Sequence, residues 1–193
     1  VRIPKGTIIY IQDPQETRLS PRQFNKLDYE QKSLVERYSY IDAQGHLVMS
    51  ADHAKFMNHS CECNTIGTAY GFEIAIRNIA AGEELTAEYG VLNIQLEYEI
   101  GCDCANCRKI LRITDIDQHY ALWDQWITAV LPAIPRVPQP LWPRMDVATR
   151  NAVEACLSGR ENYRSVLQRK WRVPAEKEND GIFEWTFQSL VNG

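Results

Sequence analysis

Two short segments of this sequence gather the residues most able to bind a metal ion or to transfer a chemical group. The segment FMNHSCECN places Asn58 and His59 shortly before Cys61 and Cys63, and a later segment, CDCANC, adds a cysteine triplet with C-x-C-x-x-C spacing. The first segment follows no amphipathic period, so packing of a regular helix or strand does not explain it. Its residue types fit a metal knuckle, a nucleophile beside its base, or the corner of a disulfide.

The distribution of the cysteines favours a metal site. Five of the six cysteines fall in these two segments, and Cys156 stands alone. No secretory signal is visible, so close clusters favour reduced metal ligands over disulfides. Thiolates at C-x-C-x-x-C spacing can meet one tetrahedral Zn²⁺, and either Cys61 or Cys63 would supply the fourth ligand. A redox loop and buried free thiols are the alternatives.

Composition and charge exclude several classes of protein. The 193 residues are 45% hydrophobic and 24% charged, which is ordinary for a globular protein with a sizeable core. No apolar run approaches the roughly 18 residues that span a bilayer, so we expect no membrane association. A net charge of −4 argues against direct binding to nucleic acid. We expect an intracellular protein of the nucleus or the cytoplasm.

The first half of the chain is predicted to be rich in short strands. Strands are expected over 6–11 and 72–76 and just before Tyr89, with a hairpin over 42–49. A helix is expected in the middle of 22–41. Strands this short and irregularly spaced do not indicate a parallel doubly wound sheet.

From Asn93 onward the sequence is predicted to be mainly helical. Apolar residues recur at spacings of three and four over 114–134, which is typical of an amphipathic helix. The segment 131–143 holds five prolines and is expected to be a rigid connector without helix. Further helices are expected over 93–100, 146–159, 161–171 and 182–191.

The order of the motifs along the chain carries a family resemblance. After FMNHSCECN come GEELTAEYG, residues 82–90, and then the cysteine triplet. This order resembles the SET-domain protein lysine methyltransferases with a zinc-binding post-SET cysteine loop, whose most telling segments are NHSCxPN and GEELTxDYG. IPKGT and IRNIAAGEEL resemble that family's early I-x-K-G turn and the strand before its second motif. The resemblance covers roughly residues 1–110.

The resemblance implies a mainly β fold with α additions. In this SET-domain β-clip, the two motifs cross in a pseudoknot built of short sheets, and a zinc loop and a helical C-terminal extension follow. We expect the SET domain over 1–99, the post-SET zinc loop over 100–112 and the helical extension over 113–193. The family's G-x-G segment, which receives the methionine part of the cofactor, is expected before Val1 in a longer protein; impaired cofactor binding is the alternative.

The activity that the resemblance implies is methyl transfer from S-adenosylmethionine to the ε-amine of a lysine in a protein substrate, with histone tails among the candidates. Such an enzyme holds a neutral lysine nitrogen about 3 Å from the methyl group. A narrow dry channel assists because it lowers the pKa of the lysine. Two rival hypotheses are a catalytically inactive SET module that binds or scaffolds, and a methyltransferase that acts on a small molecule or another nucleophile.

Individual site residues follow from the same resemblance. Tyr89 matches the catalytic tyrosine, which also lines the cofactor's methyl site and so counts among the cofactor-binding residues. Tyr38 and Tyr40 fall where the family places the aromatic residues of its lysine channel. Asn58 and His59 match residues that hold the cofactor, the first by its amide side chain and the second through its backbone. The zinc ligands that the resemblance implies are Cys61, Cys102, Cys104 and Cys107.

Three positions depart from the family pattern. Cys63 replaces a proline two residues after Cys61, so its thiol would compete for zinc. Ala87 stands two residues before Tyr89, where many members carry Phe or Tyr, and its small side chain predicts di- or trimethylated products. Ile100 stands where relatives often have an aromatic residue against the adenine, and we expect it to contact the cofactor by apolar packing.

Overall fold

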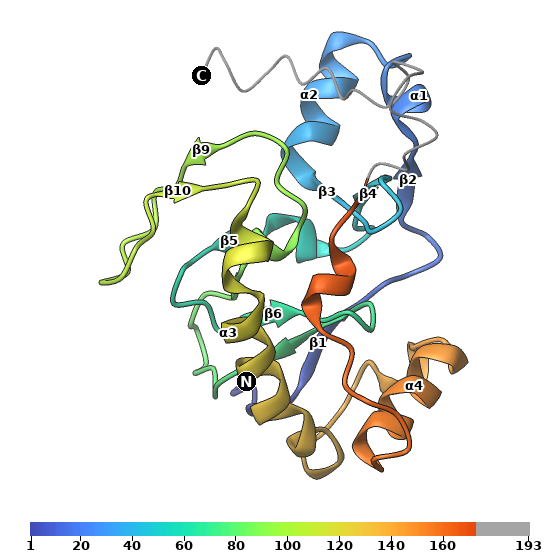
Figure 1. Cartoon of the computed structure of the whole chain (residues 1–193), viewed down its shortest axis with the longest axis vertical. Helices are drawn as coiled ribbons and strands as arrows, with labels where there is room; N and C mark the ends of the chain where they lie inside the picture. Colours follow the sequence, from blue (N-terminus) through green and yellow to red (C-terminus); the bar gives the residue numbers. More distant parts are fainter. Residues whose placement is uncertain (173–193) are drawn as a thin grey trace.

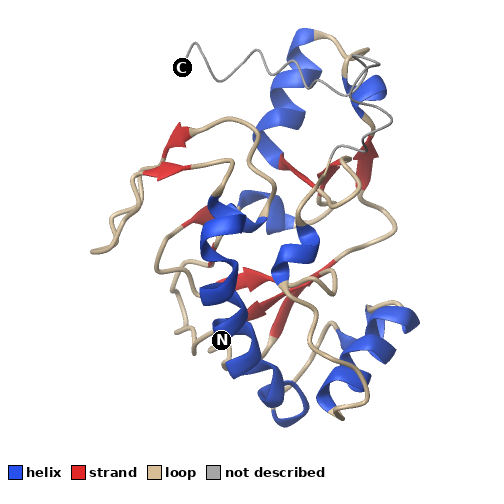
Figure 2. Ribbon diagram, in the orientation of Figure 1, coloured by secondary structure: helices blue, strands red, loops and turns tan. Residues whose placement is uncertain are grey.

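The computed structural model describes residues 1–172; Figure 1 labels the α-helices and most of the strands, and Figure 2 colours the chain by type of secondary structure. The strands are β1 Ile8–Ile11, β2 Thr17–Leu19, β3 Ser39–Ile41, β4 Leu47–Met49, β5 Asn58–His59, β6 Thr65–Gly67, β7 Phe72–Ala75, β8 Thr86–Ala87, β9 Tyr98–Glu99 and β10 Ile110–Leu111. The α-helices are α1 Pro21–Phe24, α2 Tyr29–Tyr38, α3 Asp115–Val130 and α4 Val147–Leu157. The 3₁₀ helices are η1 His53–Phe56, η2 Tyr89–Val91, η3 Leu131–Arg136, η4 Trp142–Arg144 and η5 Val166–Arg169.

A sheet of five strands in the order β1-β7-β6-β8-β5 forms the centre of the molecule. Strand β7 pairs antiparallel with β1 and β6, and its Ile and Phe side chains are buried, as suits strands that pack on both sides. Strand β8 lies between β6 and β5 and runs parallel to both. The segment that leads into Tyr89 is therefore enclosed by strands of the segment 58–67. This crossing is the pseudoknot that the sequence predicts.

A second sheet, ordered β2-β4-β3, carries the two N-terminal helices. Each helix begins at a capping box: the side chain of Ser20 before α1, and that of Asp28 before α2, accepts a hydrogen bond from the amide three residues later. The predicted hairpin over 42–49 is the antiparallel pair β3–β4. A small buried cluster joins the helices to this sheet and comprises Phe24, Val35, Ile41 and Leu47.

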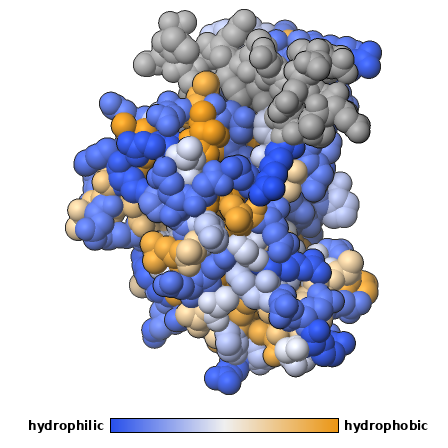
Figure 3. All heavy atoms as spheres, viewed as in Figure 1, coloured by the Kyte–Doolittle hydropathy of each residue, from blue (hydrophilic) through white to orange (hydrophobic). Residues whose placement is uncertain are grey.

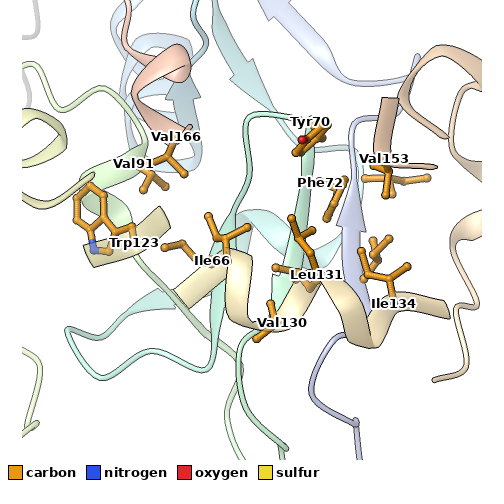
Figure 4. Packing of buried hydrophobic residues seen from close by; sticks show 14 of the residues in the cluster. Ile66, Tyr70, Phe72, Val91, Trp123, Val130, Leu131, Ile134, Val153 and Val166 are labelled. Atoms are coloured by element: carbon orange, nitrogen blue, oxygen red, sulfur yellow. The ribbon is translucent and has the colours of Figure 1, made fainter. Parts of the chain in front are cut away.

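Helix α3 packs on the central sheet, and the two halves of the chain share one core. Trp123, on the apolar face that the sequence predicts, is only 1% exposed and lies close to Val91 and Ile66 in Figure 4. A Cβ at Gly90 would lie 2.6 Å from the Trp123 ring, so only glycine permits this approach. Buried residues from both halves complete the cluster, among them Ile8, Phe72, Ile127, Leu131, Val153 and Val166.

Three of the helix predictions need correction. Residues 93–97 are not helical, because Asn93 adopts a left-handed φ of 57° and the chain then enters the two-stranded ribbon β9–β10. The proline-rich segment 131–143 does contain helix, namely η3 and η4, since a proline in the first turn lacks only an N–H that has no partner there. Within 161–171 only η5 is helical. The predicted helix over 182–191 lies outside the described residues.

After α4, residues 160–172 form a return segment that runs back along α3 toward the three-stranded sheet (orange to red in Figure 1). Asp124 on α3 accepts a hydrogen bond of 2.9 Å from the amide of Val166. The side chain of Asn93 donates to the carbonyl of Arg169 and accepts from the amide of Trp171. The return segment is thus tied to the chain that follows the second motif.

The face of the molecule shown in Figure 3 is mostly hydrophilic, with hydrophobic residues scattered between polar ones. None of the helices in the described part of the chain has the length and apolar character that crossing a membrane requires. The large apolar side chains that stay exposed include Tyr29, Phe56, Leu96, Leu122 and Val147. Dispersed residues of this kind are normal on a globular protein.

Candidate active site and metal centre

Four cysteines from two distant parts of the chain meet at one point. The Sγ atoms of Cys61, Cys102, Cys104 and Cys107 all lie within 4.8 Å of one another, and none of these residues forms a disulfide. The Sγ of Cys102 lies 3.7 Å from that of Cys61 and 3.0 Å from that of Cys107. Zinc bound tetrahedrally by four sulfurs at about 2.3 Å separates them by about 3.8 Å. The thiol set therefore fits one structural zinc ion.

Cys63 stands apart from this cluster. It is 4% exposed, and it is not among the residues whose sulfurs gather at the candidate metal site. Burial raises the pKa of its thiol, which favours the neutral form. Of the two cysteines in the first segment, the structure brings Cys61 to the triplet and leaves Cys63 as a packed core residue.

The ring of His59 connects the thiol cluster to Tyr89. Its Nδ1 accepts a hydrogen bond from the Tyr89 amide at 3.2 Å, so the ring proton belongs on Nε2, which lies 3.3 Å from the Cys61 sulfur. Burial, assisted by the charge of Arg108, lowers the pKa of His59 to about 4, so the ring is neutral. The Tyr89 hydroxyl donates to the carbonyl of Met57. The backbone amide and the hydroxyl group of Tyr89 are thereby both hydrogen-bonded to the segment FMNHSCECN.

Asn64 fastens the crossing of the two motifs. Its side chain is 1% exposed, its Nδ2 donates to the carbonyl of Glu84 at 2.7 Å, and its Oδ1 accepts from the amide of Thr86 at 2.9 Å. A buried amide that satisfies two backbone groups of the other motif holds the register of β8. The sequence analysis did not single out this residue, although it ends the segment FMNHSCECN.

A buried charge network joins the cysteine loop to the same centre. The guanidinium of Arg108 donates to Glu88 Oε1 and lies 3.3 Å from a carboxylate oxygen of Asp115, the first residue of α3. The amide of Arg108 donates to the Cys61 sulfur at 3.4 Å. Burial raises the pKa of Glu88 to about 6, with Arg108 opposing the shift. One arginine thus links the loop, the residue before Tyr89 and helix α3.

A cavity of about 560 Å³ opens beside Tyr89. This volume lies within the range of sites that bind small molecules. Burial raises the pKa of Tyr89 and of Tyr98, which keeps both phenols neutral. The tyrosines that line the cavity are Tyr10, Tyr38, Tyr40, Tyr89 and Tyr98. Its charged lining residues include Glu36, Glu73 and Arg169, the last from the return segment.

The structure brings together the residues implied for catalysis, but of those implied for cofactor binding it places only Tyr89 in the lining of this cavity. Tyr89, Tyr40 and Tyr38 line the cavity together, whereas Asn58, His59 and Ile100 are absent from its lining in the described part of the chain. Asn58 is exposed and its Nδ2 donates to Glu84 Oε1 at 2.7 Å.

His59 and Ile100 have structural roles beside the cavity. The backbone of His59 pairs with Ala87 in the sheet, and the amide of Ile100 donates to the carbonyl of Lys109 at the base of the β9–β10 ribbon. Sequence reasoning missed Tyr98, Glu73 and Arg169. No motif marks them, because strand pairing and the return segment bring them to the cavity from distant parts of the chain.

Comparison with known proteins agrees with the motifs. The family described as SET domain matches residues 1–90. Among solved structures, the chain is similar to the crystal structure of KRYPTONITE in complex with mCHG DNA and SAH, with 23% identity and a TM-score of 0.38. That match covers 57% of this chain and 25% of the other. Curated protein sequences gave no match. Residues 1–90, which hold both motifs, are therefore similar to SET domains.

Proposed function

We propose that this chain transfers the methyl group of S-adenosylmethionine to the ε-amine of a lysine in a protein substrate. The single observation that carries the proposal is the tyrosine-lined cavity beside the motif crossing, where Tyr89, Tyr40 and Tyr38 meet. A lysine side chain is a long apolar stem with a cationic end. Aromatic walls suit both the stem and the cation.

Tyr89 has the geometry for orienting an amine. Its hydroxyl proton is engaged by the carbonyl of Met57, so the oxygen lone pairs remain to accept an N–H from the substrate. A nitrogen held this way keeps its own lone pair directed away from the tyrosine and available to accept a methyl group. The neutral state of the buried phenol favours this acceptor role without a change of charge.

The residues present also fit the cofactor. S-adenosylmethionine supplies a methyl group on a sulfonium centre. The resemblance implies that Asn58 and the backbone of His59 would hold it, and Asn58 is exposed directly after the cavity residue Met57. Tyr98 presents a half-buried ring next to Tyr89 in the same cavity lining.

The proposal is tested by binding and by transfer. Calorimetric titration of the full-length protein with S-adenosylmethionine and with its demethylated product should show binding of both. Incubation with labelled cofactor and pools of lysine-containing peptides should label a peptide. Absence of cofactor binding would favour an inactive scaffold module, and label on a metabolite but on no peptide would favour a small-molecule methyltransferase.

Tyr89→Phe should lower kcat by about a hundredfold, because the variant keeps the ring and loses the acceptor oxygen. Tyr29→Phe is the matched control, since Tyr29 is 70% exposed on α2 and should retain the wild-type rate. Mass spectrometry of the product counts the methyl groups. Ala87 is buried and lines the cavity, so we propose di- or trimethylated products, and monomethyl product alone would contradict this.

A further inference from the structure

Glu73 places a carboxylate in the tyrosine-lined cavity. It lies on β7, with Tyr10 of β1 opposite it on one side and Gly67 of β6 on the other. Its side chain lines the cavity together with Tyr10 and Tyr89. The Oε2 atom is shielded from solvent and has no hydrogen-bond partner among the described residues. A carboxylate oxygen in this condition is costly to the fold unless a partner arrives from outside.

The obvious internal partner is occupied elsewhere. The guanidinium of Arg169 lies over Gly67, where a Cβ would come within 3.2 Å of its Nη1. Its Nη1 donates to the carbonyl of Thr68 at 2.7 Å and its Nε donates to the carbonyl of Val91 at 3.2 Å. The positive charge of Arg169 therefore acts on Glu73 from nearby, whereas the hydrogen bonds of its guanidinium go to backbone carbonyls.

The electrostatic surroundings of Glu73 agree with a carboxyl group that forms no ion pair among the described residues. Burial raises the pKa of Glu73 to about 7, the positive charge of Arg169 opposes the rise, and the negative charge of Asp52 adds to it. Other titratable groups near Glu73 include Tyr10, Cys63 and Tyr89. The cavity lining also holds the charged residues Glu36, Arg37 and Lys55. Near neutral pH the carboxyl is thus divided between its two forms, and a bound cation would shift it to the charged form.

We propose that Glu73 is the charge partner of the substrate in this cavity, so that its carboxylate recognises the ammonium end of an alkylamine. The identity of that amine as a lysine side chain rests on the proposed function. The cavity supplies the other half of the recognition, because its tyrosines accept the alkyl stem. Glu73 is then a residue that determines specificity for amines over neutral chains of the same length.

A pair of small probes measures this preference without any methyl transfer. n-Butylammonium and n-butanol have the same stem and differ in charge, and the amine stays charged at pH 8 because alkylamines titrate near 10.4. NMR titration of the wild-type protein at pH 8 should show the ammonium binding about tenfold more tightly. Equal affinity for the two probes would overturn the inference.

Glu73→Gln keeps the shape of the side chain and should remove the preference for the ammonium. Glu97→Gln is the matched control, because Glu97 is exposed and should leave the preference unchanged. If Glu73→Gln fails to fold, the pH dependence of binding to the wild-type protein still tests the inference. Its affinity for n-butylammonium should fall about tenfold from pH 8 to pH 6 as the carboxyl becomes protonated, and a flat profile would contradict the inference.

The two proposals fail in distinguishable ways. A protein that prefers the ammonium through Glu73 but transfers no methyl group to any peptide would overturn the proposed function and leave this inference standing. A protein that methylates peptides equally well with Glu73→Gln, and shows no charge preference between the probes, would overturn this inference alone.

Discussion

At the scale of single residues, Glu73 combines a role in binding with a cost to folding. Its pKa of about 7 in the folded chain exceeds its ordinary value of 4.5, so the native state binds a proton more tightly than the unfolded state between these two values. The free energy of unfolding therefore falls as pH rises from about 4.5 to about 7, by at most about 3 kcal/mol. Groups that destabilise the fold in this way are common where a protein binds a ligand.

Glu73→Gln should consequently be more stable than the wild type at pH 8, because the amide carries no charge that burial penalises. The two proteins should converge near pH 5, where the wild-type carboxyl is protonated. Denaturant titrations at both pH values measure the difference. A variant less stable than the wild type by the same amount at pH 5 and pH 8 would show that Glu73 makes a structural contact instead.

Most site residues predicted from the sequence lie within contiguous motifs, whereas most of those not predicted are brought to the site by contacts between distant parts of the chain. Tyr89 and Cys61 lie within contiguous motifs, so the family resemblance of those motifs was enough to mark them. Glu73 enters the cavity through pairing of β7 with β1 and β6, and Arg169 enters on the return segment. Strand pairing and chain return are non-local, and no spacing in one sequence reports them. Asn64 lay inside a motif, but only its burial reveals its role.

At the scale of elements, the ribbon β9–β10 depends on the thiol cluster. Its two strands are of two residues each, which is too little for a hairpin to be stable by itself. The thiols of the loop and Arg108 are its attachments to Cys61 and Glu88. If the cluster binds zinc, as the donor set indicates, the metal organises this part of the site.

Cys104→Ser should release zinc and lower the free energy of unfolding by at least about 2 kcal/mol, since a structural metal contributes its binding energy to folding. Metal analysis should find about one zinc per chain in the wild type and less in the variant. A chelator should lower the melting temperature of the wild type and have little further effect on the variant. A metal-free wild type with an unchanged melting temperature would contradict a structural zinc ion.

At the scale of the whole molecule, the C-terminal half belongs to the same core as residues 1–90. Trp123 of α3 packs with Ile66 and Val91, and the return segment supplies Val166 to the cluster and Arg169 to the cavity. The sequence predicted the amphipathic α3 from its spacing but gave no sign of what its apolar face covers. The helix predicted over 161–171 in the return segment was wrong except at η5, because hydrogen bonds to distant residues fix the position of this segment.

Asn93 is the residue through which the return segment can be released. It is 8% exposed, its Nδ2 donates to the carbonyls of Ile41 and Arg169, and its Oδ1 accepts from the amide of Trp171. Asn93→Ala removes all of these bonds, and it also places alanine at a φ of 57°, which alanine tolerates poorly. The expected loss is about 3 kcal/mol of unfolding free energy.

Hydrogen exchange locates that loss, because the amides of 163–171 should exchange faster in Asn93→Ala while those of β7 stay protected. Asn93→Gly separates the two causes, since glycine accepts the left-handed backbone and still lacks the side chain. Asn78→Ala is the matched control, as Asn78 is exposed and its side chain accepts a hydrogen bond from the amide of Lys5. Because Arg169 of the return segment lines the cavity, Asn93→Ala and Asn93→Gly should also bind n-butylammonium with an affinity that differs from that of the wild type. Unchanged exchange over 163–171 would show that other contacts, such as the packing of Val166 and the bond from its amide to Asp124, hold the return segment without Asn93.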